Sequence, residues 1–488
     1  MMAANARAYL LLRFMCELLG DCLWEDVYEA ELAGLQSNIA AKAMGIRFSL
    51  SGLSDLMPDL WKTIMSRLAD LTKLAKKERF EVFRESMKRV FSNHRLNPDE
   101  FAQDLRRGSM LTTHVTSWEA LKVLDEITFE ELIEIIPLFV SKSYLEILCI
   151  GNLTSAEAID LFDTTLSTLS FAPLDPNMMQ AKQTCLELPH NVMWRIKSQI
   201  PPTKDERNAV HVYFQGVRDT DTKPARVNEG SNLALEVLET VLFEPYYNEL
   251  RTCEQLAYAL HVSYHYSSGV CGFSFNIVST RDLAFLEGRI EAFVSETMNI
   301  VKGMSEEQWQ QNIGALIERK EEADYTLKDR VDRLMRSISD RTYNFDLAVR
   351  QAKELRQTTR EELIAGASSL FDARRMIIVW IEKSENASSA DSSDGDGTNP
   401  AVVEGGDGEA KMEVEVEKVS DEKGEGSEKS GKKGILPAKA TVWNGVIKKT
   451  YQCTHERGSF CKVWKECEGV KMPDLFEEGP VDKYKKAV

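Results

Sequence analysis

The spacing of apolar residues predicts that the first part of the chain is mostly helical. Apolar residues recur at intervals of three and four along four stretches, which predicts helices. These are 9–44, 58–92, 98–107 and 118–140. Alternation of apolar and polar residues predicts a strand over 46–54, and a further strand is predicted over 144–150. A turn at Gly151-Asn152 then leads into a helix that Thr154 or Ser155 caps.

A similar order of elements recurs in the second part, after the proline-rich segment FAPLDPN at 171–177. The predicted strands there are 192–198, 209–217, a hairpin over 258–279, and 376–382. The predicted helices are 227–250, 282–302, 305–339 and 346–371. This recurrence is a weak internal repeat, visible in the order of elements and hardly in the residues.

The composition changes abruptly over 384–434, where acidic residues dominate and aromatic residues are missing. Such a segment buries too little apolar surface to offset its backbone entropy, so it is predicted to be disordered. Two interpretations remain: an acidic tether that attracts cationic peptides, or a tolerated surface insertion, which we favour. Strand-like alternation returns over 440–452, which places the insertion inside a domain.

The bulk composition is that of a soluble globular protein with two or three domains. Of 488 residues, 43% are apolar and 28% charged. A net charge of -17 argues against nucleic acid or an anionic membrane as partner. No apolar run approaches the roughly 18 to 20 residues of a membrane span. Nine cysteines without regular spacing predict a reducing, cytoplasmic location.

Common catalytic and metal-binding motifs are missing from the sequence. Neither H-E-x-x-H nor H-x-x-E-H occurs, and no nucleophile elbow, P-loop or dinucleotide fingerprint is present. His261 and His265 lie four apart in a predicted strand, which separates them by about 13 Å and excludes a shared metal. The tail residues Cys453, His455, Cys461 and Cys467 lack paired C-x-x-C spacing, so surface cysteines are favoured over a zinc knuckle.

One long segment is distinctive enough to indicate a family. EPYYNELRTCEQLAYALHV, within 244–279, resembles the EP-x-[FY]-[ND]-x-LRT-x-EQLGY-x-V segment of the pitrilysin, insulysin and nardilysin peptidases. Three further stretches agree in the same order along the chain. They are YEAELAGLQSNIAAKAMGIRFSLSGLSD, SKSYLEILCIGNLT and TYNFDLA. The resemblance covers nearly the whole chain apart from the acidic insertion.

The resemblance implies a definite α/β (α+β) architecture. Insulysin-type peptidases have four homologous domains in two halves around a closed chamber, and this chain resembles the third and fourth. Each domain is then a mostly antiparallel sheet covered by helices. The implied division is a third domain at 1–172, a linker at 173–189, a fourth domain at 190–452 containing the acidic insertion at 384–434, and a tail at 453–488.

In this family the zinc motif lies in the first domain, so its absence here is expected. Zinc is expected only in the absent N-terminal half, and no metal is expected on this chain. The implied partners are that zinc-bearing half, as part of the same polypeptide or as a separate subunit, and peptide substrates. The chain also begins almost inside its first predicted helix, as if cut from something longer.

The resemblance assigns catalytic roles to two residues of the segment EPYYNELRTCEQLAYALHV. In the family the Arg and Tyr of the LRT…GY segment reach into the zinc site, and they correspond to Arg251 and Tyr258. A guanidinium and a phenol stabilise the negative charge that grows on a peptide carbonyl during attack. Tyr247 is a candidate for substrate binding, with core packing as its alternative. From the residues alone, Arg251 is also explained as a helix-dipole partner and Tyr258 as a packing residue.

Two departures from the family pattern qualify these expectations. The family glycine before the tyrosine is Ala257, which removes the freedom to adopt positive φ. The lysine-rich segment that binds polyanions in insulysin corresponds to the mixed, acidic stretch ERKEEADYTLKDR at 318–330. Activation through polyanion binding at that segment is therefore not expected.

The sequence favours the non-zinc half of an insulysin-type metalloendopeptidase, inactive without its N-terminal half. The alternative on the same fold is a non-catalytic structural or interaction subunit, which has little reason to retain both Arg251 and Tyr258. A third possibility, a helical scaffold with an acidic tail, predicts no strand pairing over 258–279.

Overall fold

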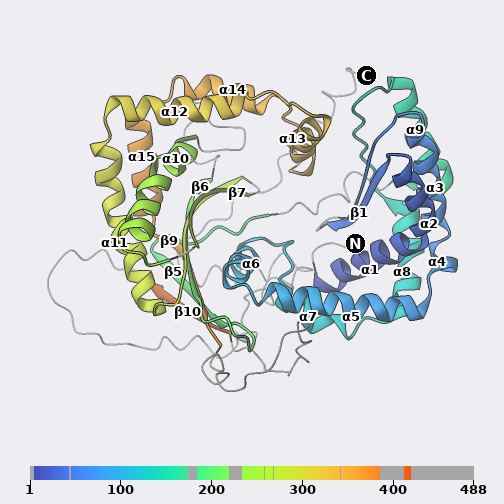
Figure 1. The fold of residues 1–488 in the computed structure, drawn as a ribbon, viewed down its shortest axis with the longest axis horizontal. Helices are drawn as coiled ribbons and strands as arrows, with labels where there is room; N and C mark the ends of the chain where they lie inside the picture. Colours follow the sequence, from blue (N-terminus) through green and yellow to red (C-terminus); the bar gives the residue numbers. More distant parts are fainter. Residues whose placement is uncertain are drawn as a thin grey trace, which may run out of the picture. The chain divides into compact units, whose positions relative to one another are not determined.

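The computed structural model describes most of the chain up to residue 418 (Figure 1). The described ranges are 5–42, 45–170, 172–173, 184–218, 233–257, 259–267, 269–340, 342–384 and 412–418. Contacts group residues 1–423 into one compact unit, and a second unit, 424–488, lies outside these ranges. The predicted strand at 440–452 and the tail with its three cysteines and His455 are therefore outside the described residues.

The first part of the chain consists mainly of helices. They are α1 (Ala6–Cys22), α2 (Trp24–Leu32), α3 (Met57–Ala69), α4 (Leu71–Leu74), α5 (Lys77–His94), α6 (Pro98–Met110), α7 (Ser117–Leu124), α8 (Phe129–Ser141) and α9 (Ser155–Leu169). Helix α1 is buried along most of its length, including Leu10, Phe14 and Leu18, and forms the centre of an apolar core. The predicted cap of α9 is confirmed, because Thr154 forms a capping box.

Two expectations for this part are wrong. The helix predicted over 9–44 ends at Leu32, where Gly34 adopts a φ of 85° and β1 (Gln36–Lys42) pairs antiparallel with β2 (Gly45–Ser51). The strand predicted over 144–150 does not form, because these residues have no ladder partner among the described residues. Only the two-residue strands β3 (Lys142–Ser143) and β4 (Ala172–Pro173) pair nearby.

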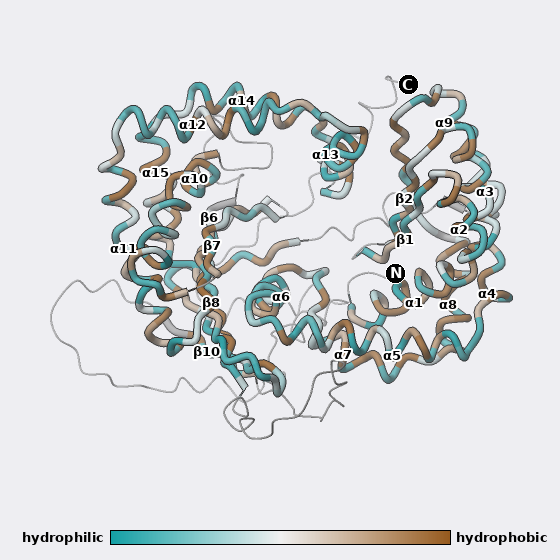
Figure 2. The backbone as a smooth tube through the Cα atoms, viewed as in Figure 1, coloured by the Kyte–Doolittle hydropathy of each residue, from teal (hydrophilic) through white to brown (hydrophobic). Residues whose placement is uncertain are grey.

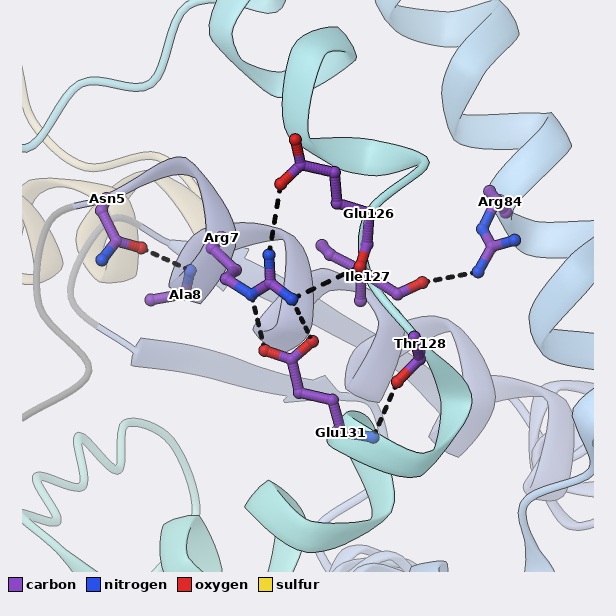
Figure 3. Close-up of polar contacts among 8 residues, drawn as sticks. All are labelled: Asn5, Arg7, Ala8, Arg84, Glu126, Ile127, Thr128 and Glu131. Carbon is purple, nitrogen blue, oxygen red and sulfur yellow. Dashed lines mark hydrogen bonds and ion pairs between the residues drawn. The ribbon is translucent and has the colours of Figure 1, made fainter.

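A polar network attaches the start of α1 to the turn between α7 and α8 (Figure 3). The Asn5 side chain accepts a hydrogen bond from the Ala8 N–H, which caps α1. Arg7 donates through Nε and Nη2 to the two Glu131 carboxylate oxygens, at 2.7 Å each. Arg84 on α5 donates to the Ile127 carbonyl in the same turn at 2.6 Å. Because the Arg7 pair is bidentate, it fixes direction as well as distance.

The second part is built on a six-stranded sheet. Its strands are β5 (Val192–Gln199), β6 (Asn208–Arg218), β7 (Ala259–Ser267), β8 (Val270–Ser279), β9 (Arg375–Glu382) and β10 (Met412–Lys418). The spatial order is β10-β5-β9-β6-β8-β7, and only the β5–β9 pair is parallel. The predicted hairpin is confirmed by the β7–β8 ladder, and Gly269 at its turn has a φ of 83°.

Six helices follow these strands in the described residues. They are α10 (Leu233–Tyr247), α11 (Leu283–Gly303), α12 (Glu306–Glu321), α13 (Leu327–Ser339), α14 (Leu347–Leu355) and α15 (Arg360–Asp372). Three of them, α10, α11 and α15, pack against the sheet. The long helices predicted over 58–92, 305–339 and 346–371 are each interrupted. Thr326 and Thr359 form capping boxes that start new helices inside the last two ranges. The fold class, a mixed α/β protein with mainly antiparallel sheets, is confirmed.

Strand β10 corrects part of the prediction for the acidic segment. It lies inside 384–434, where disorder was expected, yet residues 412–418 pair antiparallel with β5. Its sequence, MEVEVEK, alternates apolar and acidic residues, which is a strand pattern. Lys197 on β5 contacts Glu415 at 2.8 Å, so opposite charges match across the ladder. The rest of the acidic segment, beyond Ser384 and apart from β10, lies outside the described residues.

The two faces of the sheet differ in chemistry. On β6, Val210, Val212 and Phe214 belong to an apolar core with residues of α10, α11 and α15, which Figure 1 shows on one side of the sheet. The alternating β6 residues, His211 and Tyr213 among them, face the other way, where α6 packs against β6 and β9. Figure 2 shows hydrophobic residues interspersed with hydrophilic ones along these strands.

No described helix is both long and apolar enough to cross a membrane.

Candidate functional site

The candidate site lies where α10 ends and continues into a short π-helix. Helix α10 has an apolar sequence because one side packs on the sheet, and it contains Pro245 near its C-terminal end. Proline has no N–H to donate, which weakens the helical hydrogen-bond ladder at this point. The chain then widens into the π-helix η2 (Asn248–Cys253), in which the Glu254 N–H donates to the Glu249 carbonyl at 3.0 Å. Such π-turns are rare and frequently occur at functional sites.

Arg251 lies within this π-helix and stacks on a tyrosine. Its guanidinium carbon is 5.0 Å from the centre of the Tyr247 ring, and both side chains are half-buried. Tyr247 in turn stacks on Phe243, with ring centres 6.2 Å apart. Phe243 is 50% exposed, so this column of side chains extends from the core to the surface. A cation above an aromatic ring is attracted and held in one orientation, which positions the Arg251 fork.

Ion pairs and buried residues around the π-helix hold it in place. Arg289 on α11 donates to Glu249 at 2.9 Å and to Glu254 at 2.9 Å through a second nitrogen. The hydrogen bonds to Glu254 raise the pKa of Arg289. Leu250 and Leu256 are buried, and the Leu256 N–H donates to the Leu250 carbonyl at 2.9 Å. The loop between the π-helix and β7 is therefore fixed by both packing and charge.

The Ala257 substitution does not strain this loop. The residue with positive φ is Gln255, at 53°, while Ala257 is buried and is not among the residues with positive φ. The glycine that the family pattern has at position 257 is thus not required by the backbone conformation seen here. Alanine at position 257 excludes a positive φ, but the backbone there does not adopt one, so the substitution has no structural consequence.

The structure places two of the three predicted site residues together. Arg251 and Tyr247 are in contact, while Tyr258 lies outside the described residues. Tyr247 also packs against the apolar core, so both of its sequence-based interpretations remain compatible with its position. Sequence reasoning missed Phe243 and Arg289. Phe243 stacks on Tyr247, and Arg289 on α11 forms an ion pair with Glu249 in the π-helix. The spacing of Phe243, Tyr247 and Arg251, four residues each, was the available signal.

An acidic residue on α10, Glu239, was also missed. Burial raises the pKa of its carboxyl. The hydrogen bond that the carboxyl accepts from the Tyr264 backbone N–H on β7 lowers the pKa, but by less. One turn earlier, Glu236 pairs with Lys320 at 2.5 Å. Glu236 and Glu239 lie among apolar residues near the start of α10, and the sequence LALEVLETVLFEPYY contains that signal.

The described residues do not form a metal site. No group of three or more His, Cys, Asp or Glu side chains suited to a metal ion occurs among them. His265 is bonded to the Ser274 hydroxyl at 2.7 Å, and His261 is exposed on the same strand. The family resemblance implies zinc in an N-terminal half, and the described residues of this chain offer no donor set that would hold it.

Comparison with known proteins relates this chain to a family of peptidases. A model described as the middle or third domain of peptidase M16 matches residues 1–123. A model described as the PqqF-like C-terminal lobe domain 4 of PQQ synthase matches residues 237–335. The two matches fall on the two parts of the fold, in the order expected for third and fourth domains. The class of protein is thus a pair of M16-type peptidase domains.

Individual relatives agree with this class. Insulin-degrading enzyme of Homo sapiens is 30% identical over 368 residues, which is 73% of this chain and 34% of that protein. A nardilysin-like protein of Arabidopsis thaliana is 26% identical over 385 residues, or 77% of this chain and 37% of that protein. Together these matches support the C-terminal half of an insulysin-type M16 peptidase for this chain. It spans about a third of the length of these relatives.

Solved structures share the fold. Pitrilysin superposes with a TM-score of 0.63 at 19% identity, covering 78% of this chain and 39% of pitrilysin. An M16 inactive domain from Pseudomonas fluorescens superposes with a TM-score of 0.53 at 14% identity, covering 78% of this chain and 89% of that one. At these identities the likeness supports the fold and leaves the chemistry to be argued from the site.

Proposed function

We propose that this chain forms one wall of the peptide-binding chamber of an insulysin-type peptidase, and that Arg251 stabilises the charge that develops on the peptide carbonyl oxygen. The observation that supports this most directly is the Arg251–Tyr247 stack on a π-helix within a family-specific segment. A side chain held on such a turn is oriented before substrate arrives, which is the condition for electrostatic stabilisation of a transition state.

Arg251 and Tyr258 are proposed to act together on one oxygen atom. As the carbonyl carbon is attacked, its oxygen gains negative charge, and an N–H of the Arg251 fork and the Tyr258 hydroxyl donate to it. The arginine fork also binds the peptide backbone, because its planar donors match carbonyl and carboxylate oxygens. Removal of one such donor typically lowers kcat by about 10²- to 10³-fold. The zinc ion is expected in an N-terminal partner half.

Phe243 and Tyr247 are proposed to contact the substrate. The exposed edge of Phe243 and the half-buried Tyr247 ring form an apolar surface next to the Arg251 charge. A peptide bound through its backbone at Arg251 would place a side chain against these rings. This arrangement favours peptide substrates with an apolar residue beside the bond that is cleaved.

The proposal is tested by complementation. The chain is mixed with the N-terminal half of an M16 relative, and cleavage of a quenched fluorescent peptide is followed. We expect the mixture to be active and each half alone to be inactive. Arg251→Met should lower kcat of the mixture by about 10²- to 10³-fold. Arg330→Met on α13, which removes the same charge from an exposed position, is the matched control and should leave kcat unchanged.

Two results would contradict this function. Peptide cleavage by the chain alone, with or without added zinc, would show that catalysis does not need a second half. Equal activity of the Arg251→Met and Arg330→Met mixtures, with both variants bound to the N-terminal half, would show that Arg251 has no part in the chemistry.

The alternative is a non-catalytic subunit on the same fold. It is favoured by one observation, the match to a solved M16 chain of similar extent that is described as an inactive domain. For this alternative we expect the chain to bind an N-terminal half without restoring cleavage of any peptide in a random library. Binding measured by sedimentation, combined with cleavage measured on the same mixture, separates the two functions.

A further inference from the structure

A buried cluster of basic side chains lies between α6 and the polar face of the sheet. Arg106 on α6 is only 4% exposed, and His211 on β6 is 3% exposed. The Arg106 guanidinium stacks over the Tyr213 ring, with 5.1 Å between its carbon and the ring centre. Within the described residues Arg106 has no ion pair and no hydrogen bond. A charged group in this environment normally has a partner of opposite charge.

Three buried nitrogen atoms in this cluster have no hydrogen-bond partner among the residues that the structure describes. They are Arg106 Nε and both ring nitrogens of His211. At least one His211 nitrogen carries hydrogen, so each side chain presents a buried donor that nothing among the described residues accepts. Leaving such donors unsatisfied costs free energy, and an uncompensated buried charge costs several kcal/mol. An ordered ion is one of the few ways in which native structures resolve this arrangement.

The carboxylates on α6 are engaged elsewhere. Asp104 accepts from His114 at 2.6 Å and from the Ser117 N–H at 2.8 Å. Asp99 accepts from Asn276 and lies seven residues before Arg106, which is about 10 Å along the helix axis. Glu100, the third carboxylate of α6, is exposed and accepts a hydrogen bond from the Asn97 side-chain amide at 3.1 Å. None of the three carboxylates is hydrogen-bonded to Arg106, so the charge on α6 at this point remains positive.

The nearby histidines are neutral, so each has one ring N–H to donate and adds no positive charge to the cluster. Burial, with the positive charges of Arg106 and Arg107 adding to it, lowers the pKa of His265 to about 3. The pKa of His211 is lowered in the same direction by burial and by Arg106. The buried positive charge of Arg106, surrounded by neutral histidine side chains, is balanced by an anion with a single negative charge. A dianion would leave one negative charge without compensation.

We propose that a small monovalent inorganic anion, of the chloride class, binds between α6 and the polar face of the sheet, accepting hydrogen bonds from Arg106 Nε and a ring nitrogen of His211. The anion supplies the acceptor that both side chains lack. It also joins α6, which belongs to the first part of the chain, to the sheet of the second part. Anion binding should therefore strengthen the packing of α6 on β6 and β9.

The test compares chloride with gluconate, a monovalent anion too large for an enclosed site. The thermal midpoint of the whole chain is measured while chloride replaces gluconate at constant ionic strength. We expect a rise of roughly 2 to 6 °C that saturates with chloride concentration. Arg106→Met should abolish the rise. Arg107→Met, which removes the neighbouring but exposed charge on α6, is the matched control and should retain it.

The sign of the Arg106→Met effect gives a second criterion. With an anion in place, the substitution destabilises the chain in chloride; without one, removing an unpaired buried charge stabilises it in both salts. Should Arg106→Met fail to fold, crystals of the unaltered chain in bromide supply the test through anomalous scattering. A bromide within contact distance of Arg106 supports the site. Bromide at exposed residues alone, a water in this position, or identical midpoints in both salts would overturn it.

Discussion

The two faces of the six-stranded sheet achieve burial by different means. Under α10, α11 and α15 the face is filled by aliphatic and aromatic residues, and Phe275 has ring contacts with Tyr246, Phe293 and Phe371. Under α6 the face carries histidine, tyrosine, serine and asparagine side chains. An apolar face accepts any covering surface of the right shape, whereas a polar face accepts only one that satisfies its donors and acceptors. The difference shows how one sheet combines stability with a specific docking position for α6.

Removal of an aromatic ring from the apolar face should have the largest effect. Phe275→Ala deletes a fully buried ring in a cluster that cannot collapse freely, and we expect a loss of about 3 to 5 kcal/mol in the free energy of unfolding. Denaturant titration followed by circular dichroism measures it. Phe285→Ala, at a position 47% exposed, should change the value by less than about 0.5 kcal/mol. Equal losses for the two variants would contradict the contrast between core and surface.

On the polar face, the addition of one methyl group should be costly. A Cβ at Gly272 would lie 2.1 Å from the Tyr213 hydroxyl, and that ring is held beneath Arg106. We expect Gly272→Ala to destabilise the chain by about 1 to 3 kcal/mol because the buried ring must shift. Gly288→Ala on α11, where nothing lies within 4 Å, should instead stabilise it by about 0.5 to 1 kcal/mol. An unchanged free energy of unfolding for Gly272→Ala would show that the polar face is loosely packed.

Lowering the pH should reduce the free energy of unfolding through the polar face of the sheet. This change should be smaller than those caused by Phe275→Ala and Gly272→Ala. In the unfolded chain His265 binds a proton near pH 6.5, whereas in the folded chain it does so only near pH 3. Stability is therefore complete above about pH 6.5 and falls as the pH is lowered, by about 1.4 kcal/mol per pH unit for this histidine. Unfolding free energies measured from pH 7 to 5.5 in gluconate buffer give the slope.

His265→Gln should reduce that slope, while His261→Gln, at an exposed position on the same strand, should leave it unchanged. An identical slope for the two variants would show that His265 is not held neutral between α6 and the sheet.

Much of the fold follows from local patterns. Alternation predicted the β7–β8 hairpin, and a capping residue at Thr154 or Ser155 predicted the start of α9, because both signals act over a few residues. Strand β1 was mistaken for helix, since QSNIAAK lacks alternation and gains its conformation from pairing with β2. The same dependence on a partner explains the opposite error at 144–150, where a mostly apolar segment was predicted to be a strand and forms none.

The candidate site was predictable only in part. The LRT segment identified Arg251, but the π-helix that orients it depends on Arg289, which lies far along the chain on α11. Likewise, nothing local to Arg106 or His211 indicates that they lie on facing elements, because that requires α6 to pack on the sheet of the second part. Long-range packing of this kind leaves no periodic signal in the sequence.

Strand β10 has a consequence for how this chain can vary. Because residues 412–418 are anchored to β5 and the preceding strand β9 ends at Glu382, the acidic segment between them is tethered at both ends. Closing a longer tether costs little, about 0.6 kcal/mol for each doubling of its length. Insertions and deletions between these two strands should therefore accumulate freely among descendants of this sequence, provided that the short charged strand at the far end is preserved.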